Sequence, residues 1–328
     1  MMRSIAGTAL VAIACLVCSF VTQAAERQAY PVRPIRLIIS SVPGSAPDTV
    51  GRLLGASLTE IWGQQIVVDN RAGATGLIAA ETVARAAPDG YTLWLNTMTQ
   101  LISTLQARRH MLAKDFEPVS LVASTPFVIV VSNALPVKTL AEWIAYAKTR
   151  PGQLNYGSAG QWGSSHLCIE SINTIAGLSV VHVPYKGSTQ VLSDMAAGRI
   201  QIYCPAAPSL PAIMQAGRVR PIAMTYRKPT PLAPDLPAVS DTLPGFELLG
   251  WYGMQVPLGT PKELIARINA DIVKVLKTPE LMEKLFAVGA EAVGSSPDML
   301  AKFLQSETTR WDKVLREGGT IPGKKADG

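Results

Sequence analysis

Polar, glycine-rich segments follow several predicted strands, each at the point where the strand gives way to a helix. They occupy residues 40–48, 71–76, 96–97 and 158–165. In an open parallel sheet these junctions share the carboxyl edge, where ligands bind. Small residues there leave main-chain N–H groups exposed at helix N-termini, and these donors and the helix dipole favour an anion. One such loop could serve only as a tight turn, but several on one edge predict a site for a carboxylate or an anion of similar size.

The common catalytic and cofactor motifs do not occur in this sequence. Residues 73–76 lack the first half of a dinucleotide-binding pattern, and residues 157–160 are one residue too short for the hydrolase pattern Gly-x-Ser-x-Gly. Ser165 and His166 are adjacent at a predicted helix start, so their side chains point in different directions and would need a third group to form a triad. We expect no catalysis and no cofactor, and an exported α/β hydrolase is the alternative.

The three histidines do not form a metal-binding pattern. His166 and Cys168, at positions i and i+2, cannot share a helix face. We therefore expect His166 to hydrogen-bond a loop, His182 to be a core residue of a strand, and no metal site. Asp48 stands at a predicted helix start, where a carboxylate is an ordinary N-terminal residue.

The composition indicates a globular protein with two cores. The chain has 328 residues, of which 48% are hydrophobic and 16% charged. This excludes disorder and a coiled coil, and the length predicts about two domains. The net charge of +6 is spread along the chain without a basic run interleaved with aromatic residues, so we expect no nucleic-acid partner.

The first 24 residues have the pattern of a secretory signal peptide. Met1-Met2-Arg3 is a positive start, residues 5–20 are apolar, and Thr22-Gln23-Ala24 is a small-x-small end. A membrane span is the alternative, but the apolar run falls short of the ~20 residues that a bilayer requires. A lipid anchor on Cys15 or Cys18 is a second alternative. The pattern predicts an exported protein of the periplasm.

Export leaves Cys168 and Cys204 in an oxidising compartment, where a disulfide is allowed. Their spacing matches no disulfide-dense scaffold, and the chain has ample apolar residues for a core without one. We therefore expect two buried free thiols rather than a disulfide.

Alternating strand and helix patterns predict βαβ units and two α/β lobes. Residues 227–244, which lie between the predicted helix 209–216 and the predicted strand 251–256, are rich in Pro and Asp and predict an irregular surface segment. Three helices then begin at Thr260-Pro261, where Glu263 completes a capping box, at Thr278-Pro279 and at Ser296-Pro297. The predicted strands are 35–39, 66–68, 92–95, 127–131, 155–158, 180–183, 200–203 and 251–256, and the predicted helices before the last three are 48–61, 77–85, 140–149, 165–175, 190–197 and 209–216.

Ten ordered blocks give the sequence a resemblance to a known family. They are 30–36, Pro43-Gly44 with Asp48 and Arg52, Asn70-Arg71 with Gly73 and Gly76, 86–92, Asp115-Phe116 with Pro118-Val119, 154–158, 182–187, 197–199, 243–246 and 259–261. From Tyr30 to Gly318 the chain resembles the Bug or TctC-like extracytoplasmic solute receptors of tripartite tricarboxylate transporters.

The resemblance implies a type II periplasmic binding-protein fold, with two α/β lobes, a ligand cleft between them and a helical C-terminal segment. Lobe 1 would comprise residues 25–125 and 249–322, and lobe 2 residues 126–248. The resemblance also implies a monomer that captures a small anionic solute, a carboxylate or a related molecule, and presents it to membrane transporter subunits. A sensory binding subunit of a two-component system is the alternative. The implied ligand-binding residues are Ser41, Pro43, Gly44, Ser45, Asp48, Ala74, Thr75, Thr97, Ser158, Gly160, Trp162, Ser164, Ser165 and Cys204.

Three departures from the family pattern bear on the ligand. Pro47 removes one N–H donor beside the implied cleft. Residues 201–205 read Gln-Ile-Tyr-Cys-Pro, where relatives usually carry acidic residues, so we expect a more anionic or apolar-tailed ligand rather than one with an amino group. Trp162 is bulky for its loop and could stack on the solute or form an exposed lip.

Overall fold

The computed structural model describes residues 30–215, 217, 219–226, 235–246 and 248–317. The predicted signal peptide and residues 227–234 of the Pro- and Asp-rich segment lie outside the described residues. Within the described part of the chain, no helix combines the length and the hydropathy that a bilayer crossing requires.

A six-stranded sheet forms the first lobe, in the order β11-β4-β10-β3-β1-β2. β1 pairs in parallel with β2 and β3, whereas β10 runs antiparallel to both β3 and β4. The strand β4 was not predicted from the sequence, because Pro118 and Pro126 argue against a regular strand. The strands are β1 (Ile35–Ile39), β2 (Ile66–Asn70), β3 (Thr92–Thr97), β4 (Phe116–Pro126), β10 (Leu249–Pro257) and β11 (Glu291–Ala292).

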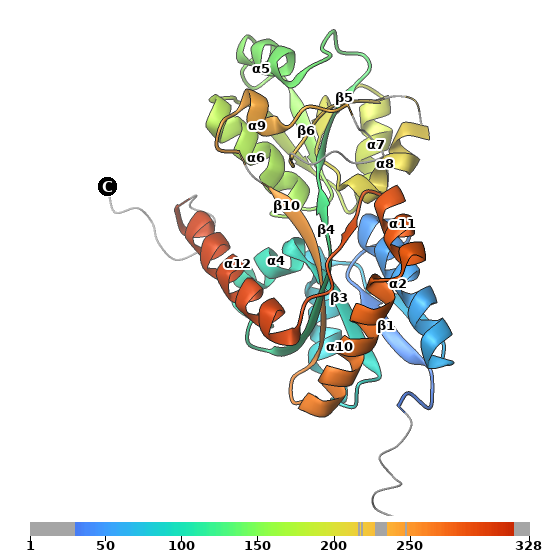
Figure 1. Cartoon of the computed structure of the whole chain (residues 1–328). Coiled ribbons are helices and arrows are strands. Elements are labelled where there is room, and N and C mark those ends of the chain that lie inside the picture. The colour runs from blue at the N-terminus through green and yellow to red at the C-terminus, as the bar shows by residue number, and fades with distance from the viewer. Residues whose placement is uncertain (1–29, 216, 218, 227–234, 247, 318–328) are drawn as a thin grey trace, which may run out of the picture.

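Helices cover both faces of this sheet (Figure 1). One apolar core lies between the sheet and the helices α2, α10 and α11, with Leu37, Leu54 and Ile268 fully buried. The helix α4 was not predicted, because it follows β3 without an intervening loop. The helices are α2 (Ala46–Trp62), α3 (Leu77–Ala84), α4 (Met98–Ala107), α10 (Lys262–Leu276), α11 (Pro279–Ala287) and α12 (Pro297–Glu317), with a 3₁₀ turn η1 (Ala74–Gly76).

A five-stranded sheet forms the second lobe, in the order β7-β6-β8-β5-β9. β6 is parallel to β7 and β8, and β5 is antiparallel to β8 and β9. The strands are β5 (Val128–Ser132), β6 (Asn155–Ser158), β7 (Val181–Pro184), β8 (Ile202–Tyr203) and β9 (Val219–Met224), and the helices are α5 (Leu140–Lys148), α6 (Ser164–Ala176), α7 (Ser188–Ala196), α8 (Leu210–Gln215) and α9 (Val239–Thr242), with a 3₁₀ turn η2 (Ala207–Ser209).

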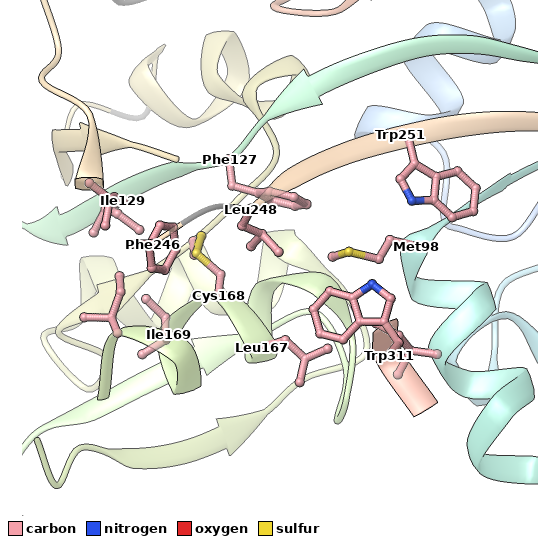
Figure 2. Packing of buried hydrophobic residues seen from close by; sticks show 14 of the residues in the cluster. Met98, Phe127, Ile129, Leu167, Cys168, Ile169, Phe246, Leu248, Trp251 and Trp311 are labelled. Atoms are coloured by element: carbon pink, nitrogen blue, oxygen red, sulfur yellow. A yellow bond between two sulfur atoms is a disulfide. The ribbon is translucent and has the colours of Figure 1, made fainter. Parts of the chain in front are cut away.

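The chain passes between the lobes on two neighbouring strands (Figure 1). β4 leads into β5 through Phe127, and β10 returns beside it with Leu249 opposite Pro126. A buried cluster continues through this junction, and Figure 2 shows Met98, Phe127, Leu248 and Trp251 within it. The structure therefore has the two α/β lobes that the alternating pattern predicts.

A disulfide joins Cys168 and Cys204, so the expectation of two free thiols is wrong. Cys168 lies on α6 and Cys204 directly follows β8; both residues are fully buried, with 6.3 Å between their Cα atoms. The two positions meet because α6 packs against its own sheet. Sequence spacing carries no information about that contact.

The capping box expected at Thr260 is also wrong. Pro261 is the N-cap of α10, and its first turn receives no side-chain hydrogen bond. The Thr260 side chain is buried and donates instead to the Pro257 carbonyl oxygen at 2.7 Å. The other two helix starts are confirmed, since Thr278 Oγ1 accepts from the Leu281 N–H and Ser296 Oγ from the Met299 N–H.

Candidate ligand-binding site

A cavity of about 660 Å³ lies between the two lobes. One wall comes from the strand-to-helix loops of the first lobe and the other from those of the second, while the two connecting strands and the start of α4 form the floor. The lining residues are 40–42, 45–47, 72–76, 97 and 99–100 on the first wall, 159–161, 164–165, 185–188, 203–206 and 209 on the second, and Met98, Thr125, Phe127 and 250–252 on the floor.

The cavity brings together nine of the fourteen residues that the sequence nominated: Ser41, Ser45, Ala74, Thr75, Thr97, Gly160, Ser164, Ser165 and Cys204. The other five, Pro43, Gly44, Asp48, Ser158 and Trp162, are not among its lining residues. Asp48, Ser158 and Trp162 instead hold or flank the loops that form the walls.

Asp48 supports the loop at the start of α2. Its carboxylate is buried and accepts hydrogen bonds from the Gly44 N–H at 2.8 Å, from Asn70 Nδ2 at 2.9 Å and from Arg52 Nε at 2.9 Å. Burial alone would raise the pKa of this carboxyl, but the three hydrogen bonds outweigh it and hold the pKa below its usual value. The charged group therefore fixes the Ser41–Ser45 loop rather than facing the cavity.

The opposite loop, residues 158–163, is fixed by side chains from two elements behind it. Ser158 Oγ lies 2.7 Å from Nε2 of His182 on β7 and donates to the Gly160 carbonyl oxygen at 3.0 Å. The Trp162 N–H donates to Nδ1 of His166 at 3.0 Å, and the Ala159 N–H to Ser165 Oγ at 3.1 Å. The prediction that His166 hydrogen-bonds a loop is confirmed.

Trp162 turns away from the cavity. Its ring packs against the buried cluster and edge-on to His166, with 4.7 Å between ring centroids. Neither of the two roles considered for it from the sequence, a stacking residue or an exposed lip, matches this position.

Both histidines behind the loop are neutral at ordinary pH. Their rings stack 3.9 Å apart, and the Tyr156 ring stacks on His182 at 4.8 Å. Burial, together with the neighbouring His182, lowers the pKa of His166 to about 3, and burial lowers the pKa of His182 to about 4. A neutral His166 can keep Nδ1 free of a proton and accept the Trp162 N–H, so the loop depends on the uncharged state.

Gln100 is a lining residue that the sequence reasoning missed. Its Oε1 accepts from the Thr97 N–H at 2.9 Å and from Thr97 Oγ1 at 2.8 Å, which caps α4. A Thr followed three residues later by Gln is the capping-box signal that could have revealed both the helix and this residue.

The charges around the cavity favour an anion. Among the described residues that line it, Lys186 is a cation and none carries a carboxylate. Cys204 also lines the cavity, and its sulfur forms the disulfide with Cys168. An amino group of a ligand would find no counter-ion there, whereas a carboxylate would meet a cation, hydroxyls and an amide.

The two walls touch across the cavity. Thr99 Oγ1, on α4 of the first lobe, accepts from the Ser164 N–H and donates to Ser164 Oγ, both at 3.2 Å. A Cβ placed on Gly160 would lie 3.7 Å from Thr75 Oγ1, which is ordinary van der Waals contact. The structure is therefore a closed arrangement of the two lobes.

No group of three or more potential metal-ligating side chains occurs among the residues that the structure describes. The cavity walls consist mainly of hydroxyl, amide and apolar side chains with main-chain groups. This set is suited to holding an organic anion by hydrogen bonds and apolar contact.

Comparisons with known proteins agree with this geometry. A UPF0065 protein from the tcbD-tcbE intergenic region of Pseudomonas sp. strain P51 is 35% identical over 300 residues, covering 90% of this chain and 89% of the relative. The structure of R. palustris Rpa4515 with adipate has a TM-score of 0.82 and 34% identity, covering 88% of this chain and 98% of that chain. MatC from Rhodopseudomonas palustris, solved with bound malate, has a TM-score of 0.79 and 29% identity, covering 87% of this chain and all of that one.

The structure of the periplasmic binding protein BugD has a TM-score of 0.82 and 28% identity to this chain, so the expected fold class is confirmed. The matching family model describes a receptor and BugD is a binding protein, so the expectation that this chain is not an enzyme is confirmed. The profile of the family described as "Tripartite tricarboxylate transporter family receptor" matches residues 50–320. The chain therefore belongs to the TctC family of solute-binding receptors, as its ten sequence blocks indicate.

Proposed function

We propose that this protein captures a small carboxylate in the cavity between its lobes and presents it to the membrane subunits of a tripartite tricarboxylate-type transporter. The observation that carries the proposal is the cavity itself, which offers Lys186, hydroxyls and the Gln100 amide but no carboxylate among its described lining residues. The adipate and malate bound in two relatives support the same ligand class.

Binding and closure form one equilibrium in this proposal. The solute contacts both walls, so it binds the closed state more tightly than the open one and shifts the population toward closure. We place the hinge at about Ala123 to Phe127 and Leu249 to Trp251, where β4 leads into β5 and β10 returns beside it. In the proposed motion, the described parts of residues 25–125 with 249–322 form one lobe and those of residues 126–248 the other, and the nine nominated lining residues make the contacts.

The proposed location is the periplasm. The signal-peptide pattern of residues 1–24 would direct export, and the closed monomer would then be the form that transporter subunits recognise. No cofactor is needed for this cycle, because binding energy alone drives closure.

Thermal-shift and calorimetric titrations with adipate and malate test the proposal. Either ligand, at about one hundred times its dissociation constant, should stabilise the protein by about 2.7 kcal/mol. Thr75→Trp should abolish the shift, because an indole at this lining position fills the space between Thr75 and Gly160. Thr309→Trp, on the exposed side of α12, is the control that should leave binding unchanged.

Two results would contradict the proposal. The first is the absence of stabilisation by any carboxylate tested. The second is unchanged carboxylate affinity in a folded Thr75→Trp variant, which would place the ligand elsewhere.

A further inference from the structure

The floor of the cavity presents carbon and sulfur to a ligand. Phe127, Trp251 and Met98 line it from the two connecting strands and the start of α4, and Figure 2 shows these side chains in one cluster. The indole N–H of Trp251 donates to Glu307 Oε2 at 3.2 Å, on the α12 side. The polar edge of that indole is therefore already used, and the ring can offer only its apolar surface to the cavity.

The Thr125 hydroxyl of the floor is also used inside the protein. Thr125 Oγ1 donates to the Gly289 carbonyl oxygen at 2.9 Å, and the Tyr252 side chain is only 2% exposed. A carboxylate or hydroxyl of a ligand placed on this floor would lose its water without gaining a donor. Such a burial is costly, so the floor selects against a second polar group.

Gln100 supplies a side-chain donor on the first wall of the cavity. The side chain is 5% exposed and lines the cavity. Because Oε1 accepts both hydrogen bonds from Thr97, the amide orientation is fixed and Nε2 points the other way. Within the described part of the chain, Nε2 has no hydrogen-bond partner, and neither does Thr75 Oγ1 nearby on the same wall. An amide N–H₂ without a partner in the protein is available to donate to a carboxylate.

The cavity is large for a short acid. One water molecule occupies about 30 Å³ in the liquid, so the cavity volume of about 660 Å³ equals that of roughly 22 water molecules. A ring or a branched hydrocarbon body fits in this space and would contact the small exposed parts of Met98, Phe127 and Trp251, which are 2–4% exposed. Each apolar group buried there would add affinity in proportion to the area removed from water.

We propose that the ligand is an acid with a single carboxylate, held by the Gln100 side-chain amide, and an apolar body that packs on the floor of Met98, Phe127 and Trp251. This inference rests on the proposed function and specifies its substrate class. Gln100 is then a ligand-contacting residue, and the floor is the feature that decides between apolar acids and polyanions.

Calorimetry with four probes tests the ligand class. Hexanoate and adipate share a chain and differ by one carboxylate, while 3-phenylpropanoate and malate represent an apolar and a polar body. We expect hexanoate and 3-phenylpropanoate to bind at least about tenfold more tightly than adipate and malate. Tighter binding of adipate or malate would overturn the inference and leave the proposed function standing, whereas binding of none of the four would count against both.

Gln100→Glu tests the contact at the carboxylate. A glutamate keeps the oxygen that accepts from Thr97 but replaces the donor with a negative charge, so the helix cap is retained. Its affinity for 3-phenylpropanoate should fall by about one hundredfold or more. Gln190→Glu is the matched control, because Gln190 Oε1 also accepts a main-chain N–H, from Lys186 two residues before α7, and its side chain is exposed and outside the lining.

The neutral analogue 3-phenylpropan-1-ol separates recognition from damage to the fold. The Gln100→Glu variant should bind this alcohol within about threefold of the parent protein, because an alcohol carries no charge to repel. Equal losses for the alcohol and the acid, or an unchanged affinity for the acid, would overturn the assignment of Gln100.

Discussion

The Cys168–Cys204 disulfide makes a quantitative prediction for stability. The two cysteines are 36 residues apart in the sequence. In the chain-entropy treatment, closing a loop of this length removes about 13 cal/mol/K from the unfolded chain, which corresponds to about 4 kcal/mol of stabilisation at 25 °C. With about 2–4 °C for each kcal/mol, the melting temperature of the reduced protein should be lower by about 8–16 °C.

Urea unfolding of the oxidised and the reduced protein measures this effect. Reduction leaves both side chains in place, so it tests the cross-link with little change in packing volume. The reduced protein should unfold at a lower urea concentration and with a larger m-value, because its unfolded chain is less compact. A Cys168→Ala/Cys204→Ala variant is the control, and its stability should not respond to reductant.

Two results would refute this reasoning. Equal stability of the oxidised and reduced proteins would show that the cross-link does not constrain the unfolded chain. Two free thiols in the denatured, unreduced protein would show that the cross-link is absent.

Two more predictions follow from contacts around the cavity. Thr99→Val removes both hydrogen bonds to Ser164 across the lobes, each worth about 1 kcal/mol. Carboxylate affinity measured by calorimetry should therefore fall about 5- to 30-fold. An unchanged affinity would show that this contact does not stabilise the closed state. The pKa values of His166 and His182 are lowered from 6.5 to about 3 and about 4, so the unfolded chain binds more protons than the folded one below pH 6.5. The unfolding free energy should therefore decrease as the pH falls from 6.5 toward 4, by up to about 1.4 kcal/mol per pH unit for each histidine, and urea unfolding of a His182→Gln variant should show a weaker decrease.

The walls of the cavity were predictable from the sequence because their position follows from topology. Parallel pairing of β1 with β2 and β3 carries the loops after these strands to one edge. Ser41, Thr75 and Thr97 therefore reach one cavity although they lie far apart in the sequence. The strand–helix alternation was enough to infer this.

The floor could not be predicted in the same way. Phe127 and Trp251 line one surface only because β10 returns beside β4, a pairing between segments more than a hundred residues apart. The prolines of β4 argue against a strand there, so β4 was not predicted, and no local sequence pattern indicates that it pairs with β10. The disulfide was missed for the same reason, since its two cysteines meet through tertiary packing.

Residues that hold a loop and residues that face a ligand have similar local sequences. Asp48 and Ser158 sit in the same polar segments as Ser45 and Gly160, yet their side chains bond to Arg52 and to His182 behind the walls. A polar residue at a strand-to-helix junction has two directions available to it. The sequence position alone does not determine which of the two it takes.

The structure also changes which donors should hold the ligand. The sequence predicted that main-chain N–H groups at helix starts would bind the anion, but Pro47 has none and the Ser164 N–H donates to Thr99. The Thr97 N–H is likewise taken by Gln100. Each of these three helix starts therefore has at least one main-chain donor missing or engaged. Side-chain donors must therefore carry a larger share of the binding. The loss of the Gln100 amide should then reduce affinity more than it would in a site where many main-chain N–H groups also bind the ligand.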